Sequence, residues 1–597
     1  MSHHIAGIRR RIMAPTTAAA TALGMALLAS CLVAVRAAAA SPSETVHAFF
    51  KEAFEERLRD GPEGATAIGR HDYDDRWADW SPAGRAAVRQ HLEARLRQAA
   101  ALPTAGLDDE DLLSLRLFRY VTETDLAADD LETHLLRVQP LYGLHTRVFL
   151  TVDRMPAHSV PEYENLLARL RAIPRYVDDQ IGILGEATAR GLTQPTAVVD
   201  VVVAQIERQL SQDAQHSALV APFEHFPSNI PAADRDRLRA AAVAAYEAAV
   251  RPAWQRLHDY VAGPYRAKAR AQVGIGSLAG GRAAYQVLIR KLTTTDRTPE
   301  EIHALGLREV GRIEAAMTAA MRETGFQGTL AEFGQHLEES AEQHFTSKEE
   351  MLVYCRNIAK IVEPELPNQF KRIPVLLFGV RAIPEDREQA MASNAQPPTA
   401  DGSTPGWFNL NTYQPEKQFR MDKQALTLHE AVPGHVFQGA VARSIAGLPE
   451  FRKYYGNSAY NEGWALYAES LGAELGLYKD PYSRYGRLSS ERFRAVRLVV
   501  DTGIHAFGWT REKALEYFKA HAPEESTAEI DRYISWPGQA LAYKLGQLEI
   551  LELRAQAESA LGARFDVREF HDVVLRDGVL PLALLREQVE RYIRQAH

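Results

Sequence analysis

Residues 427–435 of the chain read Thr427-Leu428-His429-Glu430-Ala431-Val432-Pro433-Gly434-His435. A His-Glu pair on a helix begins the zinc-hydrolase signature H-E-x-x-H, in which two histidines four residues apart share one face and the glutamate activates a water molecule. Here the fourth position is Pro433, and the second histidine comes two residues later. Six residues of regular helix turn through about 600°, so His435 would point roughly 120° away from His429.

The Pro433-Gly434 pair offers a way to bring both histidines to one metal ion. Proline removes a backbone donor and clashes with the preceding turn, and glycine tolerates strained backbone dihedral angles. We therefore predict that the helix bulges or breaks between the histidines. The alternative is a helix that ends at Val432 and leaves His435 in a loop.

A hydrolytic zinc site also needs a third protein ligand and an open position for water. Glu462 and Glu469 lie downstream and are seven residues apart, which places them on nearly the same helix face. We expect Glu462 to be the third ligand and Glu469 to receive the second N–H of a ligand histidine. The alternative is a pair of solvated glutamates, but the surrounding residues are too apolar for a solvent-exposed helix face.

This ligand set predicts hydrolysis. Two neutral histidines and one carboxylate leave Zn²⁺ a net positive Lewis acid, which lowers the pKa of bound water and polarises a carbonyl group. Glu430 does not ligate in this interpretation. It takes the proton of the water and passes it to the leaving amine.

Two segments upstream of His429, residues 372–384 and 406–413, have the composition of strands, and a polar loop over residues 385–405 separates them. An exposed strand edge beside a metal site can hold an extended peptide by main-chain hydrogen bonds. On the second strand, Asn409 and Asn411 are predicted to bind substrate. The alternative is a hairpin that only covers the core.

The carboxy-terminal third offers further candidates. Arg497, Asp501 and His505 are spaced by four and share a helix face. Arg497 is predicted to bind a substrate carboxylate or else to pair with Asp501, which we also expect to support the metal site. His505 is predicted to donate a hydrogen bond to the oxyanion. Lys544 is predicted to capture the carboxyl end of a peptide, with a solvated charge as the alternative.

The first forty residues read as an export signal, with a basic start, an apolar run over residues 16–35 and Ala38-Ala39-Ala40 before Ser41. Leu28-Ala29-Ser30-Cys31 resembles a bacterial lipobox, which would make Cys31 a lipidated residue; the alternative is a small apolar residue within the signal. We expect an exported, periplasmic protein that is either soluble or anchored by lipid at Cys31.

Residues 41–597 read as a single, mostly helical domain, with the strand and loop insert at 372–413 and a catalytic core at 427–545. Thr298-Pro299-Glu300-Glu301 and Ser347 each predict the start of a helix. Cys355 is the only cysteine after the signal, so no internal disulfide is expected. The net charge of −8, with both signs scattered, argues against a nucleic-acid partner, and no later stretch is apolar enough to span a membrane.

The motifs together resemble known families. Asn461-Glu462-Gly463-Trp464-Ala465 with Glu469 looks like the Asn-Glu-Gly-Phe-Ala element of the aminopeptidase N family, whose glutamate is the third zinc ligand. More closely, the chain resembles the bacterial family known as domain of unknown function 885, which comprises predicted zinc metallopeptidases related to the gluzincins. The stretches that carry this resemblance lie at residues 293–295, 302–307, 401–406, 429–435, 462–469, 500–505 and 537–544.

The resemblance implies a mainly α fold, with a large helical, neurolysin-like body, a deep cleft and a small β-strand element beside the metal site. It also implies a tyrosine and a histidine as oxyanion donors, which places Tyr543 first and His505 second. Many members of the family carry a second histidine after Pro-Gly-His, where this chain has Val436. His435 is therefore the candidate ligand here.

The expected function is that of an exported zinc metallopeptidase that hydrolyses short peptides, as an oligopeptidase or a dipeptidyl carboxypeptidase-like enzyme. One alternative keeps the metal but cleaves a non-peptide amide. Another is a metal-free helical protein that binds peptides without cutting them. Glu430 speaks against the last, because a binding protein needs no general base beside His429.

Overall fold

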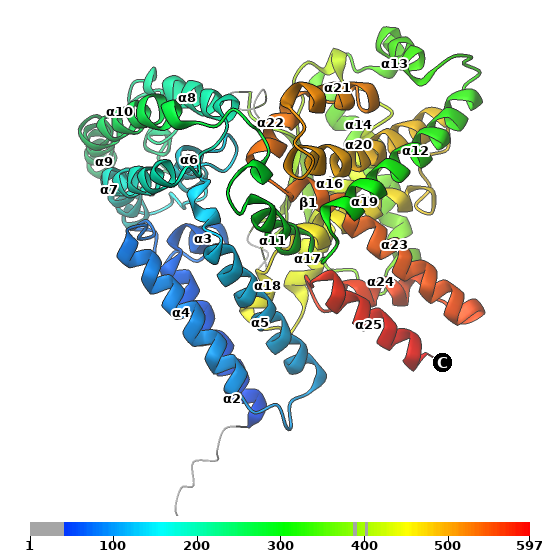
Figure 1. Ribbon diagram of the computed structural model, residues 1–597, viewed down its shortest axis with the longest axis horizontal. Coiled ribbons are helices and arrows are strands. Elements are labelled where there is room, and N and C mark those ends of the chain that lie inside the picture. Colours follow the sequence, from blue (N-terminus) through cyan, green and yellow to red (C-terminus); the bar gives the residue numbers. More distant parts are fainter. Residues whose placement is uncertain (1–40, 376, 386–387, 389–390, 400–403, 597) are drawn as a thin grey trace, which may run out of the picture.

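The computed structural model describes residues 41–375, 377–385, 388, 391–399 and 404–596. They form a mainly α fold with one small sheet, as predicted (Figure 1). The export signal with Cys31, and residues 401–403 of the family-like stretches, lie outside the described residues. None of the helices in the described ranges is long and apolar enough to cross a membrane.

The amino-terminal part consists of long helices and a separate lobe, both seen on the left of Figure 1. The lobe has its own apolar core, built from residues between 135 and 265. The helices before the lobe are α2 (Pro42–Asp60), α3 (Pro62–Ala67), α4 (Pro82–Ala101) and α5 (Asp109–Asp130), and those within it are α6 (Leu144–Val152), α7 (Val160–Arg190), α8 (Thr196–Leu210), α9 (Ala232–Ala245) and α10 (Arg251–Tyr260).

The second half of the chain forms the larger body on the right of Figure 1. Two pairs of its helices pack directly against each other, α12 against α20 and α19 against α23. The helices are α11 (Gly281–Thr293), α12 (Pro299–Glu323), α13 (Leu330–Glu339), α14 (Lys348–Val362), α15 (Leu366–Gln369), α16 (Lys423–Glu430), α17 (His435–Ser444), α18 (Glu450–Lys453), α19 (Ser458–Ser470), α20 (Pro481–His505), α21 (Arg511–His521), α22 (Ala528–Ser535), α23 (Ala542–Leu561), α24 (Val567–Leu575) and α25 (Leu582–Gln595).

The predicted helix starts are confirmed. The hydroxyl of Thr298 accepts a hydrogen bond from the backbone N–H of Glu301, and the Glu301 carboxylate accepts one from the backbone N–H of Thr298. This reciprocal capping box begins α12. Ser347 caps α14 by accepting from the backbone N–H of Glu350. Cys355 lies on α14 as a buried free thiol, and burial raises its pKa to about 11.

The sheet contains β1 (Phe378–Ala382), β2 (Asn394–Gln396) and β3 (Gly406–Leu410), in the order β1-β3-β2. β1 and β3 fall within the two predicted strand segments. They pair in parallel, so the hairpin alternative is wrong, and β2 inside the polar loop pairs antiparallel to β3. β3 is therefore the central strand, and β2 packs against α17.

The helices that carry the His-Glu stretch lie inside the largest apolar core. Leu428, Val432, Phe437 and Trp464 are all fully buried in it. A site on these helices rests on rigid surroundings. The single domain over residues 41–597 and the deep cleft both stay predictions.

Candidate metal centre

The helix that carries His429 breaks before it reaches His435. α16 ends at Glu430 and α17 begins at His435, with a four-residue connection between them. Gly434 makes this sharp turn possible, because a Cβ atom at this position would lie 1.9 Å from the carbonyl oxygen of His429. Only glycine allows the backbone to pass so close. The predicted break is confirmed.

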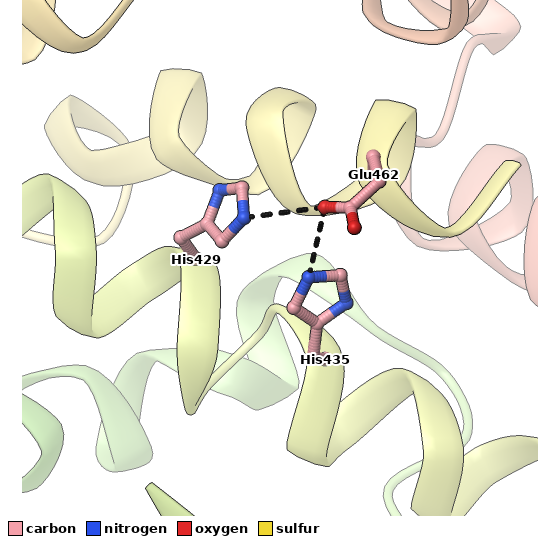
Figure 2. A group of neighbouring side chains, drawn as sticks. All are labelled: His429, His435 and Glu462. Carbon is pink, nitrogen blue, oxygen red and sulfur yellow. Dashed lines mark ion pairs between the residues drawn. The ribbon is translucent and has the colours of Figure 1, made fainter. Parts of the chain in front are cut away.

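The break brings the three predicted ligands together. The Oε2 atom of Glu462 lies 3.5 Å from Nε2 of His429 and 3.2 Å from Nε2 of His435, as Figure 2 shows. Each residue offers one ligand atom, and these atoms lie within 4.8 Å of one another. The alternative in which His435 points away into a loop is wrong. His435 is the histidine of this stretch that joins His429 in the cluster, and the neighbouring Val436 is buried in the core.

Glu469 holds the first histidine from behind. Its Oε1 atom accepts a 2.8 Å hydrogen bond from Nδ1 of His429, and its side chain is 1 % exposed. In the neutral ring this bond places the proton on Nδ1, so that the lone pair of Nε2 points toward the cluster. Burial alone would lower the pKa of His429, but Glu462 and Glu469 outweigh it and raise the pKa to about 9.

Glu430 lies beside the cluster and remains available. Its side chain forms no hydrogen bond with any described residue, yet the residue keeps 8 % of its surface exposed. Burial raises the pKa of its carboxyl group, against the opposing effect of the two histidines. A carboxylate with a raised pKa and no internal partner has the properties of a general base.

The cluster is open to solvent on one side. The side chains of His435 and Glu462 are 19 % and 21 % exposed, whereas those of His429 and Glu469 are almost fully buried. A small ligand can therefore approach from the side of His435 and Glu462. The buried side is occupied by the supporting Glu469.

Glu462 is held by a close helix crossing. A Cβ atom on the next residue, Gly463, would lie 2.5 Å from Cα of Gly546 on α23. The backbones of α19 and α23 therefore touch at these two glycines. The crossing fixes the distance between the helix that carries Glu462 and the helix that carries Tyr543.

The structure contradicts the role predicted for His505. The side chain is 1 % exposed, its Nδ1 accepts a hydrogen bond from the backbone N–H of Ile275, and its Nε2 donates to the carbonyl oxygen of Tyr533. Both ring nitrogens are used, so neither can donate to an oxyanion. Burial lowers the pKa of His505 to about 3.

Asp501 does not support the metal ligands, contrary to prediction. It is fully buried, and it accepts hydrogen bonds from the hydroxyl of Tyr285 and the backbone N–H of Gly538. Burial raises its pKa to about 7. Asp501 therefore anchors the turn before α23 rather than a ligand histidine.

Arg497 has partners other than those predicted. Its guanidinium donates to Glu529 and to the hydroxyl of Tyr533, each at 3.0 Å, and not to Asp501. It also lies 4.4 Å from the centre of the Tyr543 ring. With its charge neutralised by Glu529, Arg497 holds the Tyr543 ring and is poorly suited to bind a substrate carboxylate.

Tyr543 is mostly buried, and its hydroxyl oxygen accepts a hydrogen bond from Nη2 of Arg532 at 3.2 Å. Its own O–H is therefore free to donate.

Lys544, the residue after Tyr543, is fully buried and contacts Glu491 at 2.7 Å and Glu309 at 3.0 Å. Both interpretations of Lys544 are wrong, because it is neither solvated nor free to capture a peptide.

The two asparagines on the strand segment bond to the protein itself. Asn409 accepts from Nε of Arg381 at 2.7 Å and donates to the side chain of Asn394. Asn411 donates to the carbonyl oxygens of Glu388 and Met391. Asn411 therefore holds the preceding loop, and its substrate contact is not supported.

Two residues escaped the sequence analysis. The indole of Trp464 donates to the carbonyl oxygen of Pro433 within the helix break, and Arg494 has no acidic partner among the described residues. In the sequence, Trp464 is one apolar residue among several and carries no signal of this hydrogen bond. The signal for Arg494 was its place one turn before Arg497 on the same helix.

Comparisons with known proteins agree with the fold. The model of a family described as bacterial protein of unknown function (DUF885) matches residues 62–589. A crystal structure of a protein from Colwellia psychrerythraea, provisionally described as a lipoprotein, has a TM-score of 0.88 and 27% identity and covers 93% of this chain and 100% of its own. A similar protein of unknown function from Shewanella oneidensis, also provisionally a lipoprotein, has a TM-score of 0.71 and 18% identity, with 92% and 99% covered. No curated protein matches.

Proposed function

We propose that this chain, which belongs to the bacterial DUF885 family, is a zinc metallopeptidase that hydrolyses short peptides. The observation that supports it most is the convergence of His429, His435 and Glu462 with the unpaired Glu430 beside them. Two imidazole nitrogens and one carboxylate oxygen are the ligand set of many catalytic zinc sites. The buried Glu469 behind His429 completes the arrangement that such sites need.

Zinc, when bound by these three residues, would supply a positive charge that polarises the scissile carbonyl group. Glu430 accepts a proton from the attacking water molecule and delivers it to the leaving amine. Its raised pKa suits both steps, because the group must bind and release a proton near neutral pH. Tyr543 is the proposed oxyanion donor, since Arg532 occupies its oxygen and leaves its O–H free.

The sheet offers a place for the substrate backbone. β3 is paired on both sides, so its backbone groups are occupied, whereas β2 has one unpaired edge. β2 packs on α17, which begins with the ligand His435. An extended peptide that added to this edge would lie beside the metal centre.

Location is a separate part of the proposal. The apolar run before residue 41 and the lipobox at Cys31 support export to the periplasm, with a lipid anchor at Cys31 as the alternative to a soluble form. The related proteins from Colwellia psychrerythraea and Shewanella oneidensis, both provisionally described as lipoproteins, add support for the anchor.

The test combines metal analysis with one substitution. We expect purified protein to hold about one zinc ion per chain, and Glu430→Gln to keep the zinc while peptide hydrolysis falls by about 10²-fold or more, since general base catalysis contributes about 10²–10⁴-fold. Glu416→Gln is the matched control, because Glu416 is exposed and has no ion pair among the described residues. A wild type without zinc, or a fully active Glu430→Gln variant, contradicts the proposal.

A further inference from the structure

One arginine on α20 lacks the acidic partner that its neighbours have. Four of the five arginines on this helix form ion pairs, and all four partners are glutamates. Arg494 forms no ion pair with any described residue. The paired arginines are Arg484 with Glu323, Arg487 with Glu491, Arg492 with Glu524 and Arg497 with Glu529.

The guanidinium of Arg494 is nevertheless held in place. Its Nη1 donates to the hydroxyl and the carbonyl oxygen of Ser490, at 2.6 and 3.3 Å. Its Nε is buried and has no hydrogen-bond partner in the described part of the chain. Nε of Arg492 and Nη1 of Arg497 on the same helix also lack a partner among the described residues, so Arg494 differs from them in its missing glutamate, which leaves its charge available to an anionic ligand.

The helix that carries Arg494 lies against the helix that carries His429 and Glu430. α20 packs against α16, the helix that ends at Glu430. The two helices approach closely where a Cβ atom on Gly486 of α20 would lie 2.1 Å from the carbonyl oxygen of Met421, two residues before α16 begins. An acidic group near Arg494, Glu525, forms no ion pair with it among the described residues. Burial raises the pKa of Glu525 to about 7. At neutral pH Glu525 therefore only partly compensates the positive charge.

We propose that Arg494 binds the C-terminal carboxylate of a peptide at the metal centre, so that the enzyme acts on the free carboxyl ends of short peptides. This rests on the proposed peptidase function. Guanidinium groups bind carboxylates through two parallel N–H···O bonds, and Arg494 has donors left for this. Arg497, one turn later, is already neutralised by Glu529, so Arg494 replaces it as the carboxylate-binding residue.

The experiment uses pairs of peptides that are identical except for a free carboxylate or an amide at the C-terminus. Hydrolysis by the zinc-loaded full chain is followed by mass spectrometry. We expect the wild type to favour the free acid at least 10-fold in kcat/KM. Arg494→Gln should lose about 10–100-fold on the acid, mainly through KM, and less than about 3-fold on the amide, because the lost interaction is a charge-assisted hydrogen bond.

Two further variants separate this role from a structural one. Arg484→Gln is the matched control on the same helix and should leave the preference for the acid unchanged. Arg494→Lys keeps the charge but loses the paired donors, so it should restore part of the preference. Zinc content and circular dichroism of each variant show that it is folded and loaded.

The outcomes distinguish the two proposals. If the wild type hydrolyses the acid and the amide equally, the carboxylate role of Arg494 is wrong and the peptidase function stands. If Arg494→Gln remains folded and zinc-loaded and keeps the full preference for the acid, Arg494 is also excluded. If the zinc-loaded wild type cleaves no peptide of either kind, the proposed function itself fails.

Discussion

The indole Nε1 of Trp464 donates a 2.8 Å hydrogen bond to the carbonyl oxygen of Pro433. Trp464 comes two residues after the proposed ligand Glu462, and Pro433 comes two residues before the proposed ligand His435. One hydrogen bond between buried groups thus ties the helix break to the helix that carries the proposed third ligand.

Removing this bond should loosen the metal centre. Trp464→Phe keeps most of the apolar volume but leaves the buried oxygen of Pro433 without a donor, which costs about 1–3 kcal/mol. We expect the free energy of unfolding in urea to fall by that amount and zinc to bind more weakly. Trp509→Phe is the control, because its indole N–H bonds to none of the described residues. Equal stability losses in the two variants would contradict this role.

Gly434 should tolerate no side chain. The carbonyl oxygens of His429 and Leu428 would lie 1.9 and 2.3 Å from a new Cβ, so the backbone of the break must move. We expect Gly434→Ala to lose zinc binding and several kcal/mol of stability, as overpacking and backbone strain together predict.

Gly311→Ala provides the contrast for that measurement. Gly311 lies within α12, and a Cβ there would meet nothing within 4 Å. Replacing a helical glycine by alanine gains roughly 0.5–1 kcal/mol. The free energies of unfolding of the two variants should therefore change in opposite directions, and Gly311→Ala should bind zinc like the wild type. A neutral Gly434→Ala would show that the break is not fixed by this contact.

Glu469 should affect the affinity for zinc more than the rate of hydrolysis at saturating zinc. Glu469→Gln replaces the charged acceptor of His429 by a neutral one, and substitutions of such supporting groups cost about 10–100-fold in metal affinity or activity. We expect weaker zinc binding by competition with a chelator, with most activity restored at saturating zinc. Glu474→Gln, which alters only a surface ion pair with Arg554, should bind zinc like the wild type.

His505 should make the free energy of unfolding depend on pH. Its pKa is about 3 in the fold, below its ordinary value near 6.5. Between these values the unfolded chain binds a proton at this histidine and the folded chain does not. The contribution of His505 to the free energy of unfolding is therefore fully present above about pH 6.5. It is lost as the pH falls toward 3, by up to about 1.4 kcal/mol per pH unit.

Urea unfolding at pH 7, 6 and 5 tests this expectation. His505→Gln removes the titrating group, so the free energy of unfolding should fall less steeply with acid than in the wild type. The exposed His336 gives the control His336→Gln, whose slope should match the wild type. Identical slopes for all three proteins would show that His505 is not held in its neutral form.

Local patterns in the sequence predicted much of the fold and of the site. The capping residues Thr298 and Ser347 act within one helical turn, and so does the Pro-Gly break after His429. The spacing of Glu462 and Glu469 also depends only on helical periodicity. Each of these predictions concerns a relationship that a single helix or its end already determines.

Partners of buried charges could not be predicted in the same way. Periodicity placed Arg497, Asp501 and His505 on one face but could not show what that face meets. Arg497 meets Glu529 from α22, and Lys544 meets Glu491 and Glu309 from two other helices. β2 is equally non-local, since the short stretch Asn394-Ala395-Gln396 becomes a strand only where β3 offers an unpaired edge.

The contact between Gly463 and Gly546 limits how the molecule can admit a substrate. Two helices that touch backbone to backbone have no clearance to slide or rotate, and this contact lies one residue from Glu462. Any opening motion must therefore leave α19 and α23 moving as one rigid unit. In the proposed peptidase, substrate entry would have to come from displacement of other elements around that unit, while Glu462 and Tyr543 keep their separation.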